Sequence, residues 1–303
     1  MTDKKQLLGH IGAAVCVCVW GFTFVFTSIL LREMTPFEIL FFRISLGTLA
    51  LYIVYPKPMG KTTLKQELLF AGAGLSGVTL YFIAENFALL NTAVSNVGVI
   101  VAVSPVFTGL LSWRFLDRKR PKASFFLGFA LAICGIGLIS FAGSRLELSP
   151  VGDLLAALAA LCWAVYCVFT TKMSGFGFHI IQITRRIFAY GLVFLLPVII
   201  FMNFRLGFYR FATPVNLFSI VFLGLGASAG GFLLWNFALE RLGPVKTTVY
   251  IYLIPPVSVV AAVLFLNETV TWMKALGIVL TLAGLVISNW KSAKKPEMQK
   301  SEE

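Results

Sequence analysis

Charged residues are the first shortage in this sequence. Only 13% of the 303 residues are Asp, Glu, Lys or Arg, whereas soluble domains carry about 25%. Hydrophobic residues make up 58%, and the mean hydropathy is +0.89. This composition excludes an ordinary soluble protein. The formal net charge of +12 does not indicate nucleic-acid binding either, because the basic residues lie between long apolar runs and not on one polar surface.

Residues that hold metals or form disulfide frameworks are also scarce. The sequence has two histidines, neither in an HExxH pattern, and its five cysteines all lie inside apolar runs. Such cysteines are typical of small packing residues. A Walker loop, an acidic metal cluster and a nucleophile elbow are missing as well. We therefore expect no metal, no cofactor, no enzyme activity and no ATP-driven pumping.

Long apolar runs are what the sequence has in abundance. A helix needs about 20 mostly apolar residues to cross the hydrocarbon core of a bilayer. Ten stretches reach that length, and short connectors with turn formers, such as "YPKPMGKTT", separate them. The sequence therefore predicts an all-α polytopic membrane protein with ten transmembrane helices. The predicted spans are 7–30, 37–55, 67–90, 94–113, 124–142, 152–173, 179–201, 215–239, 246–266 and 272–290.

The basic residues predict the orientation of these spans. Of the 25 lysines and arginines, three lie inside spans and five lie between spans on one side, which leaves seventeen on the side that holds both termini. Connectors rich in lysine and arginine stay in the cytoplasm. We expect an integral protein of the cytoplasmic (inner) membrane with both termini inside. The first run is too long for a signal peptide and should be retained as a span, and residues 291–303 should form a disordered cytoplasmic tail.

The second half of the sequence repeats the first. The segment "NFALLNTAVSNVGVIVAVSP" from Asn86 returns as "NFALERLGPVKTTVYIYLIPP" from Asn236. Each repeat, 9–142 and 152–290, contains five spans. Because five is odd, the second repeat enters the membrane from the opposite side, and such inverted repeats are common in secondary transporters. Further aligned pairs are Trp20 with Trp163, Arg43 with Arg186, and Pro105 with Pro255.

The repeated motifs resemble those of a known family. They include "WGFTFV", "FFRISLG" and "NFALLNTAVSNVGVIVAVSPVFTGLLSWRFL" in the first half, with "TRRIFAYG" and "NFALERLGPVKTTVYIYLIPPVSVVAAVLFLNETVT" as their echoes. The segments "LGFALAICGIGLIS" and "ALGIVLTLAGLVIS" close the two halves. In this order they are similar to the ten-span EamA-type members of the drug/metabolite transporter superfamily, over residues 9–290. The sequence departs from the family at "WRFLDRKRPK", where such proteins usually carry an acidic residue, as "FLNETVT" does at Glu268.

This resemblance implies transport of a small molecule. It also implies that spans 1, 3, 4, 6, 8 and 9 surround a substrate cavity, whereas spans 5 and 10 lie at the periphery and could support a homodimer. Export is the tendency of the family, and the sequence itself does not fix a direction.

Arg43 and Glu85 are the most informative charges inside the spans. A charge in the hydrocarbon core costs about 2.5–3.5 kcal/mol for arginine unless it is paired or faces water. Both residues lie roughly 8–9 Å from the same membrane face, so we predict a salt bridge or a shared wet cavity. Arg186 repeats Arg43, which favours a buried, structural role for both arginines. Glu85 has no repeat mate, since Trp235 stands in its place, and this favours proton coupling or attraction of a cation.

Other residues are candidates for the cavity or for the scaffold. Aromatic residues far from the membrane interface either pack in the core or line an organic ligand. Asn86 and Asn236 are repeated and are predicted to be structural. Pro105, Pro255 and Pro256 should kink spans 4 and 9, at gate elements or as tolerated kinks. The predicted cavity residues are Trp20, Phe24, Glu85, Asn96, Trp163, Tyr166, Trp235, Tyr250 and Tyr252.

These features together predict a secondary transporter. It would export small metabolites, amino acids or amphipathic cationic compounds, by alternating access. The expected partners are a small-molecule substrate and the lipid bilayer, without nucleic acid. A passive uniporter or channel of the same fold is one alternative. A polytopic membrane enzyme or lipid-handling protein is another, but it would need a catalytic cluster that the sequence lacks.

Overall fold

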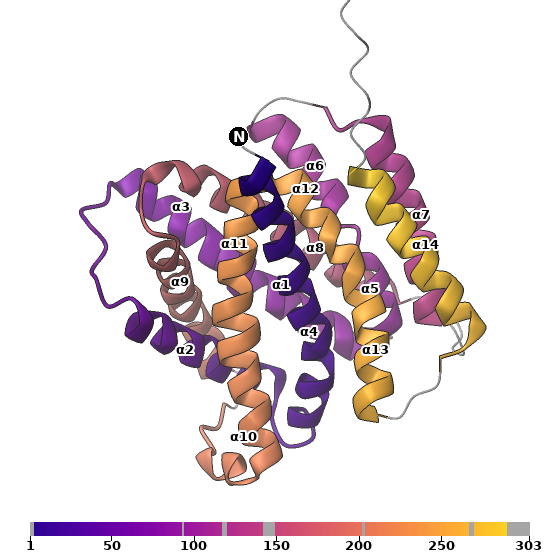
Figure 1. Cartoon of the computed structure of the whole chain (residues 1–303). Helices are drawn as coiled ribbons and strands as arrows, with labels where there is room; N and C mark the ends of the chain where they lie inside the picture. Colours follow the sequence, from indigo (N-terminus) through magenta and orange to yellow (C-terminus); the bar gives the residue numbers. More distant parts are fainter. Residues whose placement is uncertain are drawn as a thin grey trace, which may run out of the picture.

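The chain folds into a bundle of membrane-spanning helices, seen in a computed structural model that describes residues 3–92, 94–116, 120–141, 149–201, 204–266 and 270–289 (Figure 1). Within these residues, ten helical stretches are long and apolar enough to cross a membrane. Their bounds lie within about four residues of the predicted spans, because the apolar runs end where charged and turn-forming residues begin. The described residues contain no strand.

Each half supplies five spans, and several spans consist of more than one helical segment. The first half contains α1 (Asp3–Leu30), α2 (Pro36–Val54), α3 (Leu64–Gly74), the π-helix η1 (Leu75–Leu80), α4 (Tyr81–Asn91), α5 (Val94–Val101), α6 (Ser104–Phe115) and α7 (Ala123–Phe141). The second half contains α8 (Pro150–Met173), η2 (Ser174–Phe176), α9 (Ile180–Phe201), η3 (Phe208–Ala212), α10 (Pro214–Val221), the π-helix η4 (Phe222–Gly230), α11 (Gly231–Leu242), α12 (Pro244–Thr248), η5 (Val249–Leu253), α13 (Ile254–Leu266) and α14 (Trp272–Asn289).

The bundle has two faces, which we name by the chain segments found there. The N-terminal face is the one where α1 begins and α14 ends, both at the top of Figure 1, and it includes connectors 55–63 and 177–179. The opposite face includes connectors 31–35 and 204–213. These names carry no assumption about which face meets the cytoplasm.

Glycines allow the two halves to pack closely in matching ways. A Cβ added to Gly47 on α2 would lie 3.0 Å from the carbonyl oxygen of Gly224, and one added to Gly74 would lie 2.8 Å from the amide nitrogen of Gly191 on α9. Span 2 thus packs on span 8 in the way that span 7 packs on span 3. The two halves are therefore an inverted repeat in space as well as in sequence.

These contacts also fix the register between spans 2 and 7. Helix α2 begins at Pro36 and α9 begins at Ile180, an offset of 144. Two equivalent caps precede them. The Glu38 carboxylate accepts a hydrogen bond from the Thr35 backbone N–H at 2.7 Å, and the Gln182 side-chain oxygen accepts one from the His179 backbone N–H at 3.1 Å. Both satisfy a backbone donor at a helix start.

Spans 5 and 10 close the two halves and pack on each other. Helices α7 and α14 lie side by side at the right edge of Figure 1. Gly135 and Gly277 face each other so closely that a Cβ on either would lie 2.5–2.6 Å from the other's carbonyl oxygen. Gly128 and Gly284 are equally close further along the two helices, where a Cβ on either would lie 2.6 Å from the other's carbonyl oxygen. This seam of small residues lets the helix backbones touch, as in many membrane helix pairs. Both helices lie at the periphery of the bundle in Figure 1.

Candidate functional site

Three tryptophans from different spans meet between the two halves. The ring centroids of Trp20 on α1 and Trp163 on α8 are 5.3 Å apart, edge to face. Trp235 on α11 lies 5.1 Å from Trp20 and 5.7 Å from Trp163. The Trp20 indole N–H donates to the carbonyl of Ala227 at 2.9 Å. Because Trp20 and Trp163 are repeat mates, this tryptophan cluster marks the contact between equivalent helices of the two halves.

A carboxylate adjoins this tryptophan cluster. The Tyr81 hydroxyl donates a hydrogen bond to Oε1 of Glu85 at 2.8 Å, one turn along the same helix. The Tyr81 ring lies 5.1 Å from the Trp163 ring. Oε2 of Glu85 accepts no hydrogen bond from another described residue. One carboxylate oxygen is therefore held in place, and the other is left for a partner that these residues do not supply.

Arg43 brings a positive charge to the same region. Its Nε donates to Oγ of Ser228 in π-helix η4 at 2.9 Å, and its guanidinium lies 5.0 Å from the centre of the Phe82 ring. Arg43 and Glu85 attract each other electrostatically. Within the described residues, the ion pairs with nitrogen and oxygen within 4.0 Å are Arg186–Glu67 and Arg210–Glu38. Arg43 and Glu85 therefore do not form a direct ion pair.

The predicted salt bridge between Arg43 and Glu85 is therefore wrong as a direct contact. Ser228 binds one edge of the guanidinium and Tyr81 binds one oxygen of the carboxylate, and these bonds hold the two charges apart. The terminal nitrogens Nη1 and Nη2 of Arg43 donate no hydrogen bond to a described residue. We call Arg43, Tyr81, Phe82, Glu85 and Trp163 the central site. It presents a cation, an anion and aromatic rings within one region.

Asn236 connects three helices beside the central site. Its side-chain oxygen accepts from the Tyr166 hydroxyl at 2.7 Å, and its side-chain N–H group donates to Thr184 at 3.0 Å. Tyr166 and Trp235 are both 0% exposed. In this conformation the two aromatic residues pack in the core, which is one of the two roles considered for them, and their lining of a cavity stays a prediction.

The other predicted cavity residues lie in different places. Tyr250 hydrogen-bonds with Nδ1 of His10 at 2.8 Å, near the start of α1. Tyr252 is 0% exposed and packs in a separate cluster with residues of α7. Asn86, which was predicted to be structural and not to line the cavity, is partly exposed, and its structural role stays a prediction. The side chains of Phe24 and Asn96 lie outside the described residues, so their roles stay predictions. Of the predicted set, the structure brings together Trp20, Glu85, Trp163, Tyr166 and Trp235, with the Tyr166 ring 5.0 Å from that of Trp163.

Both repeats contain a helix break at the predicted prolines. Helix α5 ends at Val101, and α6 begins at Ser104 with Pro105 in its first turn. In the second half, the 3-10 helix η5 ends at Leu253, and α13 follows with Pro255 and Pro256 in its first turn. Proline is tolerated in the first turn of a helix, because the backbone N–H that it lacks would have no partner within the helix there. A gate role for these matching breaks stays a prediction.

Arg186 does not have the buried position that the repeat predicted. Its side chain is 43% exposed and pairs with Glu67 at 2.6 Å. The reason is the register: at the structural offset of 144, the mate of Arg43 is Ile187, which is 0% exposed. One residue turns a helix position by about 100°, so Arg186 points to a different neighbour. The buried arginine of α9 is Arg185, at 4% exposed.

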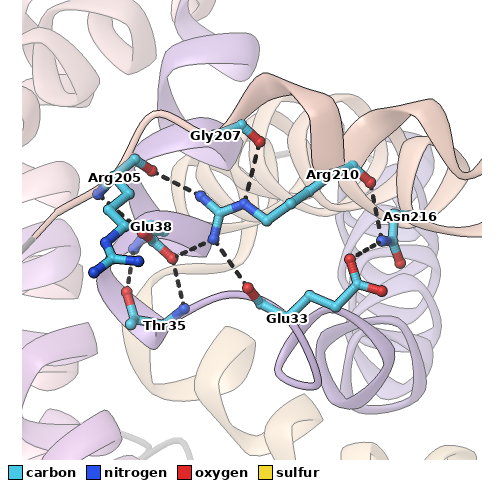
Figure 2. A network of polar contacts seen from close by, with 7 residues as sticks. All are labelled: Glu33, Thr35, Glu38, Arg205, Gly207, Arg210 and Asn216. Atoms are coloured by element: carbon cyan, nitrogen blue, oxygen red, sulfur yellow. Dashed lines mark hydrogen bonds and ion pairs between the residues drawn. The ribbon is translucent and has the colours of Figure 1, made fainter.

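A buried ion pair lies at the opposite face (Figure 2). Nη1 of Arg210 lies 2.8 Å from Oε2 of Glu38, and the two side chains are 8% and 3% exposed. Oε1 of Glu38 accepts from the Arg205 backbone N–H at 3.0 Å. Arg210 also donates to the carbonyls of Arg205 and Glu33, at 2.7 and 3.0 Å. We call these residues the Glu38 network, and it ties connector 204–213 of the second half to span 2 of the first.

Replacing Arg210 with Gln should destabilise the protein by roughly 2–4 kcal/mol, because it leaves the Glu38 carboxylate buried without its cation. The double variant Glu38→Gln/Arg210→Gln should recover part of that loss. Arg32→Gln removes an exposed arginine at the same face and should change little. Thermal unfolding of the purified proteins measures all three. An Arg210→Gln variant as stable as Arg32→Gln would show that this ion pair contributes nothing.

Sequence reasoning missed several residues of these sites. Thr35 and Glu38 match the capping pattern of a Thr followed three residues later by a Glu, so the local cap could have been found. The contact with Arg210 joins residues 172 positions apart, and no local pattern reveals it. Tyr81 and Phe82 look like ordinary residues of an apolar run, and only the fold turns them toward Glu85 and Arg43.

Comparison with known proteins identifies the family. The EamA-like transporter family matches residues 7–141 and 150–290. An uncharacterized transporter of Archaeoglobus fulgidus is 28% identical over 96% of this chain and 99% of its own length. A probable terminal-alkyne amino-acid exporter of Streptantibioticus cattleyicolor is 30% identical over 82% of each chain. A protein crystal structure with 18% identity has the same fold, with a TM-score of 0.76 over 95% of this chain and 97% of that one. The chain therefore belongs to the EamA-like transporter family, whose two domains are its two repeats, and it is an integral membrane transporter, not an enzyme.

Proposed function

We propose that the protein exports zwitterionic amphipathic metabolites, amino acids above all, by alternating access. The observation that carries this proposal is the pair of opposite charges in the central site. Arg43 and Glu85 attract each other but do not form an ion pair, and each has polar atoms without a partner among the described residues. The central site therefore has a donor group on Arg43 and an acceptor oxygen on Glu85 that could bind a ligand carrying both charges.

An α-amino acid has the chemistry to bridge these two residues. Its carboxylate would bind the terminal nitrogens of Arg43, and its ammonium group would bind Oε2 of Glu85. Charge-assisted hydrogen bonds of this kind are the strong ones. The rings of Phe82, Tyr81 and Trp163 suit an apolar side chain and, through the faces of the rings, a nearby cation. A ligand with one charge would leave the other residue uncompensated.

The name of one relative supports the same substrate class. The relative from Streptantibioticus cattleyicolor, 30% identical, is named a probable terminal-alkyne amino-acid exporter. Its name supports both the class and the direction for this chain. The excess of lysine and arginine at the N-terminal face favours both termini in the cytoplasm, which is the orientation proposed here for the cytoplasmic membrane.

Binding of matched ligands tests the substrate class. The purified protein is heated with an amino acid such as leucine, with the amine that lacks its carboxylate, and with the acid that lacks its amino group. A ligand that binds the folded state raises the unfolding temperature by mass action. The amino acid should raise it most. If the amine raised it as much as the amino acid, the substrate would be a cation and Arg43 would not contact it.

Transport by the protein in liposomes separates a carrier from a channel. Vesicles loaded with unlabelled amino acid should accumulate labelled amino acid from outside, because a carrier exchanges the two through one alternating site. A channel or a simple pore would equilibrate the label without this accumulation.

The homodimer predicted through spans 5 and 10 stays a proposal. Because α7 and α14 contact each other inside one chain, only their outer surfaces are left for contact with a second chain.

A further inference from the structure

A cavity of about 250 Å³ opens at the N-terminal face, and none of its lining residues belongs to the central site. It lies between the end of α2, connector 55–63 and the first turns of α9. Its walls include Tyr52, Met59, Gly60, Gln182, Arg185 and Arg186. Gln182 donates from its side chain to the carbonyl oxygens of Pro58 at 2.8 Å and Lys57 at 3.4 Å. The connector is thereby held against α9, so the cavity belongs to the folded structure.

The cavity contains a buried positive charge without a carboxylate. Arg185 is 4% exposed. Its Nη1 and Nη2 donate to the carbonyls of Tyr55 at 2.8 Å and Lys57 at 2.9 Å, and its guanidinium lies 4.2 Å from the centre of the Tyr52 ring. No carboxylate within the described part of the chain forms an ion pair with it. Buried charges are normally paired with an opposite charge, so this cavity lacks an anion.

The neighbouring acidic residue is already engaged. Glu67 pairs with Arg186 at 2.6 Å and also accepts hydrogen bonds from Thr62, at 2.6 Å, and from the Tyr190 hydroxyl. It therefore neutralises Arg186 and not Arg185. Lys57 and Lys61 on the connector are exposed and add positive charge at the same face.

The opposite face shows that the scaffold does not require this cavity. At the offset of 144, Arg185 and Arg186 correspond to Phe41 and Phe42 of α2. These two rings pack on aromatic residues of the equivalent connector, with centroid distances of 5.0 Å for Phe41–Phe204, 5.6 Å for Phe42–Phe208 and 5.0 Å for Phe42–Phe211. One face thus holds packed rings where the other holds two arginines and a cavity, so the arginines belong to a feature of the N-terminal face alone.

We propose that this cavity binds the headgroup phosphate of an anionic phospholipid. The cavity lies at the ends of spans, where headgroups are found, and basic pockets between membrane helices suit such headgroups. Apolar, exposed side chains follow the lining residues Tyr52 and Thr62 in the sequence. Ile53 is 70% and Val54 69% exposed at the end of α2, and Leu64 and Leu68 are 77% and 64% exposed at the start of α3. They offer a surface for acyl chains, which a free phosphate ion does not have, and this favours the lipid.

Gly60 allows a test that leaves the Arg185 hydrogen bonds intact. It lines the cavity, and a Cβ placed on it would meet only Cε1 of Phe178, at 4.0 Å. Gly60→Glu therefore adds a carboxylate beside the cavity and supplies the missing anion from the chain itself. Gly60→Gln adds the same bulk without charge. Arg114→Gln removes an exposed arginine from the same face but outside the cavity, and it controls for net charge.

The measurement is the unfolding temperature of the full-length protein in detergent, with phosphatidylglycerol, phosphatidylcholine or inorganic phosphate added. We expect phosphatidylglycerol to raise it by about 3–8 °C in the wild type, Gly60→Gln and Arg114→Gln. Gly60→Glu should lose at least about half of this rise. Phosphatidylcholine and phosphate should have little effect on any variant.

Three outcomes would overturn the proposal. Equal stabilisation by phosphatidylglycerol and phosphatidylcholine would show that the headgroup charge is not recognised, and this comparison needs only the wild type. Equal stabilisation by inorganic phosphate would assign the cavity to a soluble anion. An undiminished rise in Gly60→Glu would place the lipid elsewhere. If Gly60→Glu does not fold, Arg185→Gln takes its place in the same comparison with Arg114→Gln.

Discussion

Replacing Glu85 with Gln should lower the rate of amino-acid transport roughly 10- to 100-fold. The glutamine retains an oxygen that can accept the Tyr81 hydrogen bond, so the packing around position 85 is kept. What is lost is the negative charge that the substrate ammonium group would bind. A hydrogen bond to a charged group contributes about 1.5–3 kcal/mol, and each 1.4 kcal/mol corresponds to about tenfold. Counterflow in liposomes measures the loss.

Glu240→Gln is the matched control for this experiment. Glu240 is an exposed carboxylate near the end of α11, and its loss should leave transport unchanged. Thermal unfolding of both variants without substrate shows whether either is misfolded. If Glu85→Gln transports at the wild-type rate and with the same pH dependence, Glu85 has no part in binding or coupling, and the proposed use of the central site fails.

Replacing Gly135 with Ala should destabilise the fold by about 1–3 kcal/mol. The added Cβ would lie 2.5 Å from the Gly277 carbonyl oxygen and 2.6 Å from the Thr281 backbone nitrogen. Neither backbone atom can move without separating α7 from α14, and overpacking of this kind is destabilising. The expected result is a clearly lower unfolding temperature than that of the wild type. The folded variant should also be lost at a lower detergent concentration or a lower temperature than the wild type.

Gly137 provides the matched control on the same helix. A Cβ at Gly137 meets nothing within 4 Å, and alanine is a better helix former than glycine by about 1 kcal/mol. Gly137→Ala should therefore be neutral or slightly stabilising. Equal effects of the two substitutions would mean that the contact between α7 and α14 contributes little, and that the fold is held by the other eight spans.

The sequence predicts the spans well because their signal is local. Runs of about 20 apolar residues can satisfy their backbone groups in a bilayer only as helices, so spans such as Ala123–Phe141 are found within one residue. The repeat aligns Trp20 with Trp163, and the structure brings these two residues together, a contact that the alignment alone did not predict. The length and polarity of a span and the repetition of a motif can be recognised in the sequence without knowing which residues pack beside each other.

The site was harder to predict because its contacts depend on rotation about each helix. Aligning Arg43 with Arg186 differs from the structural register by one residue, and that single step exchanges a buried position for a partly exposed one. Glu85 was found because a carboxylate is rare in a span. Its neighbours Tyr81 and Phe82 were not, since aromatic residues are common there, and neither was Ser228, which the π-helix η4 turns toward Arg43.

The Glu38 network at the opposite face differs from the contacts of Gln182, Arg185 and Arg186 at the N-terminal face. This difference should influence which conformation the carrier prefers when it holds no substrate. If both halves were identical, the inward-open and outward-open conformations would be equivalent and equally populated. At the opposite face, separating connector 204–213 from α2 would break the buried Glu38–Arg210 pair. At the N-terminal face, separating connector 55–63 from α9 would break neutral amide bonds of Gln182 and the bonds from Arg185 to carbonyls. The ion pair at that face, Arg186–Glu67, is partly exposed and is therefore the weaker of the two. Under the orientation and the export that we propose, the empty carrier would rest open to the cytoplasm, where it would collect its substrate.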